Sequence, residues 1–131
     1  MDERPVEQIV REDGTFAFFD GTSVYTLQAD GTFRLTPAGM SGRTIEGCYR
    51  FVEGSNASVE VVGRWSWING ISARNDYRRM RFTVSPLHRP VSPDEVMGRE
   101  HVFDSVFEME ELRAITPAAY EEGMQTCHRA H

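Results

Sequence analysis

Three Asp-Gly pairs divide the first quarter of the chain into short segments, and this punctuation constrains the fold more than any other feature. The pairs lie at 13–14, 20–21 and 30–31. Glycine supplies the positive φ that tight hairpin turns need, and aspartate also tolerates it. The segments next to the pairs are rich in strand-favouring residues and cover Thr15–Phe19, Ser23–Gln28 and Thr32–Thr36. The pattern therefore predicts a β-meander.

Later segments are longer and alternate between apolar and polar residues. Successive side chains of a strand point to opposite faces, so this alternation is typical of half-buried strands. We expect strands over Thr44–Val52, Ser58–Ile68, Tyr77–Ser85 and Glu100–Glu110. Asn69-Gly70 is a strong two-residue hairpin signal. The residues after it, 71–76, are mostly polar, so we expect the return strand to begin near Tyr77.

Two further segments do not follow the strand pattern. Residues 86–99 contain Pro86, Pro90 and Pro93 and predict a long loop, a feature that often carries function. A C-terminal helix is expected over about 117–129, because a threonine cap and a proline open it. Its apolar stripe is narrow and predicts contact with the sheet.

The strand count favours a closed fold. Seven or eight strands in an open sheet would leave exposed edges, which closure into an up-and-down barrel removes. The sequence therefore predicts a mainly β chain: an antiparallel up-and-down barrel of about eight strands with a C-terminal α-helix. We expect one domain over 1–131, with the barrel at about 15–110. A β-sandwich is the alternative.

Composition excludes several kinds of chemistry. The chain has no lysine, which excludes a lysine Schiff base and a P-loop. The net charge is −6, and residues 90–131 hold nine acidic side chains against three arginines. Such a chain repels phosphate backbones, so we expect no nucleic-acid partner. No apolar run is long enough to span a bilayer, and we expect no membrane partner.

The N-terminus and the cysteines give weaker signals. Residues 1–5 are charged and lack a secretory apolar segment, so we expect a cytoplasmic protein, or a periplasmic or secreted one if a signal was removed. Cys48 and Cys127 do not define a disulfide framework, and we interpret both as small buried residues. Cys127 and His131 have a spacing that suits two metal ligands, but two ligands do not make a site. We predict neither metal nor cofactor.

Two stretches resemble a known family. Residues 25–35 contain a strand, an Asp-Gly-Thr-Phe turn and a second strand, and residues 46–51 follow with Gly-x-Tyr. Over roughly 15–68 the chain resembles small bacterial lipocalin-like domains, of the calycin type. Its first predicted strand lacks the Gly-x-Trp motif with which true lipocalins open. The resemblance implies an eight-stranded barrel whose interior holds one small apolar ligand, and it implies no binding residues.

We selected six candidate ligand-binding residues by the faces they share. Trp65 and Trp67 lie on one face of their strand and either line a cavity or fill the core. Arg79 and Arg81 are expected to face outward, which places Arg78 on the inner face, where it could meet an anionic headgroup. Polar and aromatic groups in strands complete the set: Tyr49, His101 and Phe103.

These residues support three functional hypotheses. The first is a binding module for a small molecule that is apolar or carboxylated. The second is a non-enzymatic interaction or accessory domain with a filled barrel, including a homodimer. The third is an isomerase or cyclase that acts inside the barrel, with Tyr49 and His101 as acid–base groups. No catalytic motif is present, so we predict no catalytic residue.

Overall fold

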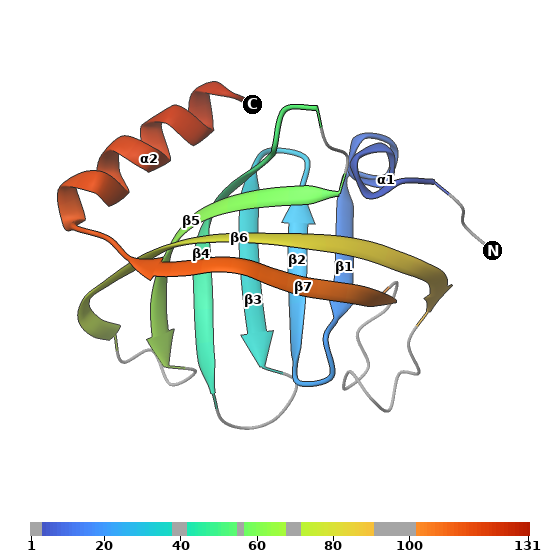
Figure 1. The fold of residues 1–131 in the computed structure, drawn as a ribbon, viewed down its shortest axis with the longest axis horizontal. Helices are drawn as coiled ribbons and strands as arrows, with labels where there is room; N and C mark the ends of the chain where they lie inside the picture. Colours follow the sequence, from blue (N-terminus) through green and yellow to red (C-terminus); the bar gives the residue numbers. More distant parts are fainter. Residues whose placement is uncertain (1–3, 38–41, 55–56, 68–71, 91–101) are drawn as a thin grey trace.

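The computed structural model describes residues 4–37, 42–54, 57–67, 72–90 and 102–131. Within these ranges the chain forms seven strands between two helices (Figure 1). The elements are α1 (Val6–Asp13), β1 (Thr15–Phe19), β2 (Ser23–Gln28), β3 (Thr32–Pro37), β4 (Arg43–Phe51), β5 (Ser58–Trp67), β6 (Ser72–Pro90), β7 (Val102–Ala114) and α2 (Pro117–Arg129). The predicted mainly β barrel with a C-terminal helix is confirmed, and α2 has the predicted bounds.

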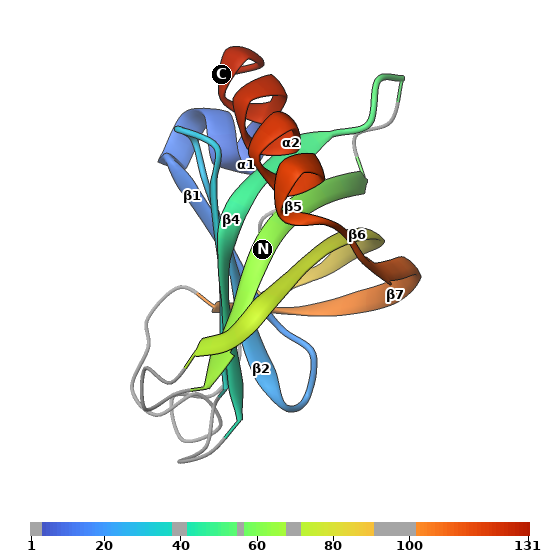
Figure 2. The same cartoon turned by 90° about the vertical axis from the view of Figure 1, so that its left-hand side faces the viewer.

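The strands close in sequence order, from β1 round to β7. Each strand pairs antiparallel with the next, and β1 then pairs with β7 in parallel. Parity explains the parallel closure, because the first and last of seven alternating strands run in the same direction. This seam is short, with three residue pairs between 17–19 and 102–104. β6 and β7 cross in front of β1–β4, and a side view shows them projecting away from those strands (Figures 1 and 2).

Aromatic rings fill much of the interior. Phe18 stacks on Tyr25 with centroids 4.6 Å apart, and it also contacts Phe82 and Phe107. Phe33 contacts both Tyr25 and Phe82. These rings come from strands on both sides of the barrel, so the middle of the interior is packed rather than hollow.

The Asp-Gly pairs have two different roles. Gly21 and Gly31 have positive φ, and in each pair the aspartate Oδ1 accepts a backbone N–H two residues later. These two pairs form the predicted hairpin turns. Gly14 instead ends α1, where its N–H donates to the Val10 carbonyl. This helix was not predicted from the sequence, although Val6, Ile9 and Val10 have helical spacing and are all buried in the core.

β6 is longer than predicted at both ends. It begins at Ser72, not near Tyr77, and a register shift against β5 lies between these two residues, opposite Arg64 and Ser66. It also continues through Pro90, so the first part of the segment predicted as a loop is strand; residues 91–99 lie outside the described ranges. Proline fits there because beyond residue 84 the described strands pair with β6 on one side only, and an edge strand needs fewer N–H donors.

The helix α2 lies on the outer face of β4, β5 and β6. Its cap is as predicted, since the Thr116 side chain accepts from the Ala119 N–H at 3.0 Å. A disulfide joins Cys48 of β4 to Cys127 of α2. Both cysteines are buried, as expected, but the bond between them was not predicted. The pairing arises because α2 folds back across the strand that carries Cys48.

Candidate functional site

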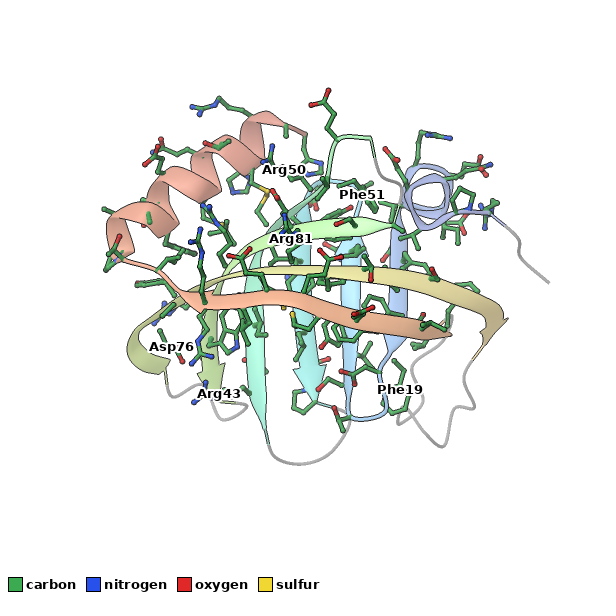
Figure 3. All side chains as sticks on the ribbon, in the orientation of Figure 1. Phe19, Arg43, Arg50, Phe51, Asp76 and Arg81 are labelled. Carbon is green, nitrogen blue, oxygen red and sulfur yellow. A yellow bond between two sulfur atoms is a disulfide. The ribbon has the colours of Figure 1, made fainter. Side chains whose placement is uncertain are left out.

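Three polar side chains lie together near the first residues of β4 and in the first part of β6. Asp76 Oδ1 accepts from Arg78 Nε at 2.9 Å, and Asp76 Oδ2 lies 3.4 Å from Arg43 Nη1. Arg78 alternates with Met80 and Phe82, which are buried, so it lies on the inner side of β6, as the alternation predicted. Figure 3 shows Asp76 and Arg43 adjacent at one end of the barrel.

Trp65 completes what we name the barrel-end cluster: Arg43, Trp65, Asp76 and Arg78. The Arg78 guanidinium carbon lies 5.5 Å from the centroid of the Trp65 ring. That distance is within the range of a cation–π contact. Trp65 is itself buried and stands directly opposite Ile45 in the β4–β5 pair. The indole therefore provides an apolar base on which the guanidinium rests.

The barrel-end cluster carries a net positive charge, because two guanidinium groups face one carboxylate. A guanidinium has five N–H donors. Within the Arg78 guanidinium, Nε donates to Asp76. The two η nitrogens have no hydrogen-bond partner among the described residues. An inward-facing arginine with unused donors can bind a carboxylate through two parallel hydrogen bonds.

An apolar wall stands close to the cluster. Leu112 pairs directly with buried Met80, so both point to the inner side of the barrel, yet Leu112 is 47% exposed. Met109 pairs in the same way with Phe82 and is 37% exposed. The inner face of this part of β7 is therefore uncovered in the described structure. Ala114, two residues beyond Leu112, pairs with Arg78, which puts Leu112 at the diagonal spacing of ~7–8 Å.

The structure brings together two of the six predicted site residues, Trp65 and Arg78. Phe103 lies at the opposite end of β7, where it stacks on Phe16 at 5.4 Å and supports the seam. Tyr49 is fully buried, and its hydroxyl donates to the Gln28 carbonyl at 2.7 Å. Burial raises the pKa of Tyr49. The Trp67 side chain and His101 lie outside the described residues.

Arg43 and Asp76 were not among the site residues predicted from the sequence. Their spacing places both on the inner face of their strands. Arg43 precedes Ile45 by two positions, and Asp76 precedes Arg78 by two. The signal was present in the sequence. Both residues nevertheless lie just before the predicted strands, which were expected to begin at Thr44 and near Tyr77.

Two cavities that described residues line lie outside the barrel interior. One, of about 350 Å³, lies between α2 and the sheet and is lined by Arg50, Glu60, Val62, Arg79, Glu122 and Gly123 among others. The other, of about 450 Å³, lies beside α1 and is lined by residues that include Val10, Arg11, Tyr49, Phe51 and His131. Both contain charges at their rims, and neither includes a member of the barrel-end cluster.

One group of side chains has the composition of a metal site. Ligand atoms of Cys48, Cys127 and His131 all lie within 4.8 Å of one another. Both sulfur atoms are joined in the disulfide, whereas a metal requires thiolates. The group is therefore a disulfide with His131 beside it, and the His131 ring contacts the Tyr49 carbonyl.

Comparisons of the chain with protein-family models, with curated proteins and with solved structures find no match. The fold is compatible with a calycin-like barrel on its architecture alone. No helix in the described ranges is long and apolar enough to cross a bilayer.

Proposed function

We propose that this protein binds a small amphipathic carboxylate at the barrel-end cluster. The carboxylate would bind Arg78 and Arg43, and the apolar part would lie along Leu112. The observation that carries the proposal is the position of Arg78, which faces inward over Trp65 with unpartnered η nitrogens in the described structure. The Arg78 side chain is 29% exposed, so its free donors can be reached from solvent, and a guanidinium matches a carboxylate in two-pronged geometry.

The packed interior limits how deep such a ligand reaches. Phe18, Tyr25 and Phe82 contact one another across the barrel and leave the middle occupied. We therefore place the ligand at the end of the barrel, between Trp65 and the uncovered part of β7. The resemblance to lipocalin-like domains supports binding at the level of fold only.

Fluorescence of the two tryptophans tests the proposal. We expect decanoate to change the emission of the wild-type protein in a saturable way, and decanol, which lacks the charge, to bind at least tenfold more weakly. Hydrogen bonds to a charged group contribute about 1.5–3 kcal/mol, so Arg78→Gln should weaken decanoate binding by about tenfold or more. Trp65→Phe should remove most of the emission change, and Trp67→Phe should retain it.

Arg64→Gln is the matched control, because Arg64 neighbours Trp65 in the chain but is exposed on the other face. Equal losses in the Arg64 and Arg78 variants would contradict the proposed site. A wild-type protein that shows neither a fluorescence change nor a calorimetric signal with any straight-chain or aromatic carboxylate would contradict binding itself.

A second candidate is a non-enzymatic accessory domain with a filled barrel. The packing of Phe18, Phe33 and Phe82 in the interior favours it. Under this proposal the function would depend on the protein surface, and the packed interior would contribute only to stability. Failure of every carboxylate in the binding experiment, together with wild-type stability of Arg78→Gln, would favour this candidate over the first.

We also propose that the protein functions in an oxidising compartment. The Cys48–Cys127 disulfide supports this, because disulfides persist in secreted and periplasmic proteins and are rare in the cytosol. Rapid alkylation of thiols in intact cells that produce the chain should leave both cysteines unmodified. Modification of both would favour the cytoplasmic alternative.

A further inference from the structure

One edge of β7 has no strand partner along most of its length in the described structure. β7 pairs with β6 through Ala114, but its other edge pairs with β1 only over 102–104. Three exposed large hydrophobic residues lie on the unpaired part: Val106, Met109 and Leu112, with 61%, 37% and 47% exposure. A strand edge with unpaired backbone groups is a template for pairing with another chain.

We propose that this edge pairs with the same edge of a second copy of the chain. The two β7 strands would run antiparallel about a two-fold axis between residues 110 and 111. A residue and its partner on the second copy would then have numbers that sum to 221. A two-fold interface uses the same surface on both copies, so every favourable pair away from the axis occurs twice.

The faces of the side chains agree with this register. Phe107, Met109, Leu112 and Ala114 pair with inner-face residues of β6, whereas Glu108 and Arg113 pair with Thr83 and Arg79 on the outer face. The β-bulge at residue 110 accounts for the change of parity between Met109 and Leu112. About the proposed axis, Met109 faces Leu112 of the second copy on the inner side. Val106 faces Ile115 on the outer side.

The charges also agree. Glu108 of each copy would stand opposite Arg113 of the other copy, so the interface contains this pair twice. Both residues are exposed, and Arg113 also contacts Glu111 within its own chain at 2.9 Å. Opposite charges directly across a strand pair stabilise it. A register shifted by two residues, with a sum of 219, would place Glu108 against Glu111 twice and Val106 against Arg113 twice.

Glu110 and Glu111 would meet across the axis. Each copy brings its own cation to this point, since Arg81 Nε lies 3.2 Å from Glu110 and Arg81 Nη2 lies 3.8 Å from Glu111. Arg81 is on the outer face of β6 beside this part of β7 (Figure 3). The two arginines offset the four carboxylates in part, so we expect a weak dimer. A single pair of short edges is also a small interface, and small interfaces are usually transient.

Analytical ultracentrifugation with charge reversals tests the pairing. We expect the wild-type protein to change from monomer to dimer as its concentration rises through the micromolar to high micromolar range. Glu108→Arg alone and Arg113→Glu alone each place like charges across the axis twice, so each variant should dimerise at least tenfold more weakly. The double variant restores both pairs and should dimerise like the wild type.

A mixture of the two single variants gives the sharpest result. The Glu108→Arg variant carries arginine at both positions, and the Arg113→Glu variant carries glutamate at both. The arginines of one would face the glutamates of the other, so the mixture should form a heterodimer although neither variant forms a homodimer. Arg129→Glu, on the exposed side of α2, is the control for net charge and should dimerise like the wild type. Circular dichroism checks that each variant is folded.

A wild-type protein that is monomeric at all concentrations would overturn the proposal. So would dimers that persist in both single variants, because these would use another surface. Glu108 and Arg113 lie on the outer face and outside the barrel-end cluster, although Leu112 belongs to both proposals. The charge reversals therefore test the dimer without removing a ligand contact. At concentrations where the wild type is monomeric, the variants should bind decanoate as the wild type does.

Discussion

The role of an individual residue in this protein depends mainly on which face of its strand it occupies. Arg78 and Arg79 are neighbours in the sequence, but Arg78 rests on Trp65 inside the barrel, whereas Arg79 lies against Gly123 of α2. A Cβ on Gly47 would overlap the backbone carbonyl of Val62, so glycine is required where β4 and β5 approach closely. One position along a strand thus decides whether a side chain lies in the barrel-end cluster or against the helix.

Two buried tyrosines should make the stability of the protein sensitive to alkaline pH. Burial, followed by the Asp20 carboxylate, raises the pKa of Tyr25, and burial, followed by Asp30 and Glu7, raises the pKa of Tyr49. In the unfolded chain both phenols ionise near their ordinary value of 10.0. Above that pH the unfolded state binds fewer protons than the folded state, so the free energy of unfolding falls as pH rises.

Denaturant unfolding between pH 8 and pH 12 measures this effect. Tyr49→Phe should cost about 1 kcal/mol at pH 8, because the bond to the Gln28 carbonyl is lost. Above pH 10 the variant should lose stability less steeply than the wild type, by up to about 1.4 kcal/mol per pH unit. Identical slopes for the two proteins would contradict a raised pKa at this position.

At the level of elements, α2 depends on a covalent link. Cys127 is its one buried residue, and its other notable contact is the stacking of Tyr120 on Tyr77 at 4.4 Å. Such a narrow contact stripe buries little apolar surface, so packing alone holds the helix weakly. The disulfide closes a long loop and keeps the helix on the sheet.

Removal of the disulfide should lower the free energy of unfolding substantially. For a sequence separation of 79 residues we expect a loss of about 2–5 kcal/mol in the double variant Cys48→Ser, Cys127→Ser. A thiol reductant should shift the urea midpoint of the wild type to that of the double variant and leave the variant unchanged. Equal midpoints for oxidised wild type and double variant would show that the link contributes no stability.

For the whole molecule, the seam between β1 and β7 is the weakest part of the barrel. It contains three parallel pairs, whereas β4 and β5 share nine antiparallel pairs. Parallel pairing is slightly less stable per residue. Closure also joins the two ends of the sheet, so it depends on every strand between them.

Hydrogen exchange should show that this seam opens first. We expect amides of 102–104, and those of β1 that point toward β7, to exchange faster than amides in the centre of β4 and β5. Phe103→Ala removes the stacking on Phe16 and should accelerate exchange at the seam more than elsewhere. Protection at the seam equal to that of the β4–β5 pair would contradict this view of closure.

Local patterns in the sequence were enough to predict the strands, most turns, the bounds of α2 and the inner position of Arg78, because alternation, Asp-Gly turns and helix caps act over a few residues. They did not predict α1 or the last four residues of β7. They also missed both ends of β6, where an edge position tolerates the prolines and ion pairs accommodate the polar residues. Three features became visible only in the folded chain: Cys48 meets Cys127, Asp76 lies between Arg43 and Arg78, and β7 retains an unpaired edge in the described structure. These features depend on residues far apart in the chain, and barrel closure, not local preference, sets which of them meet.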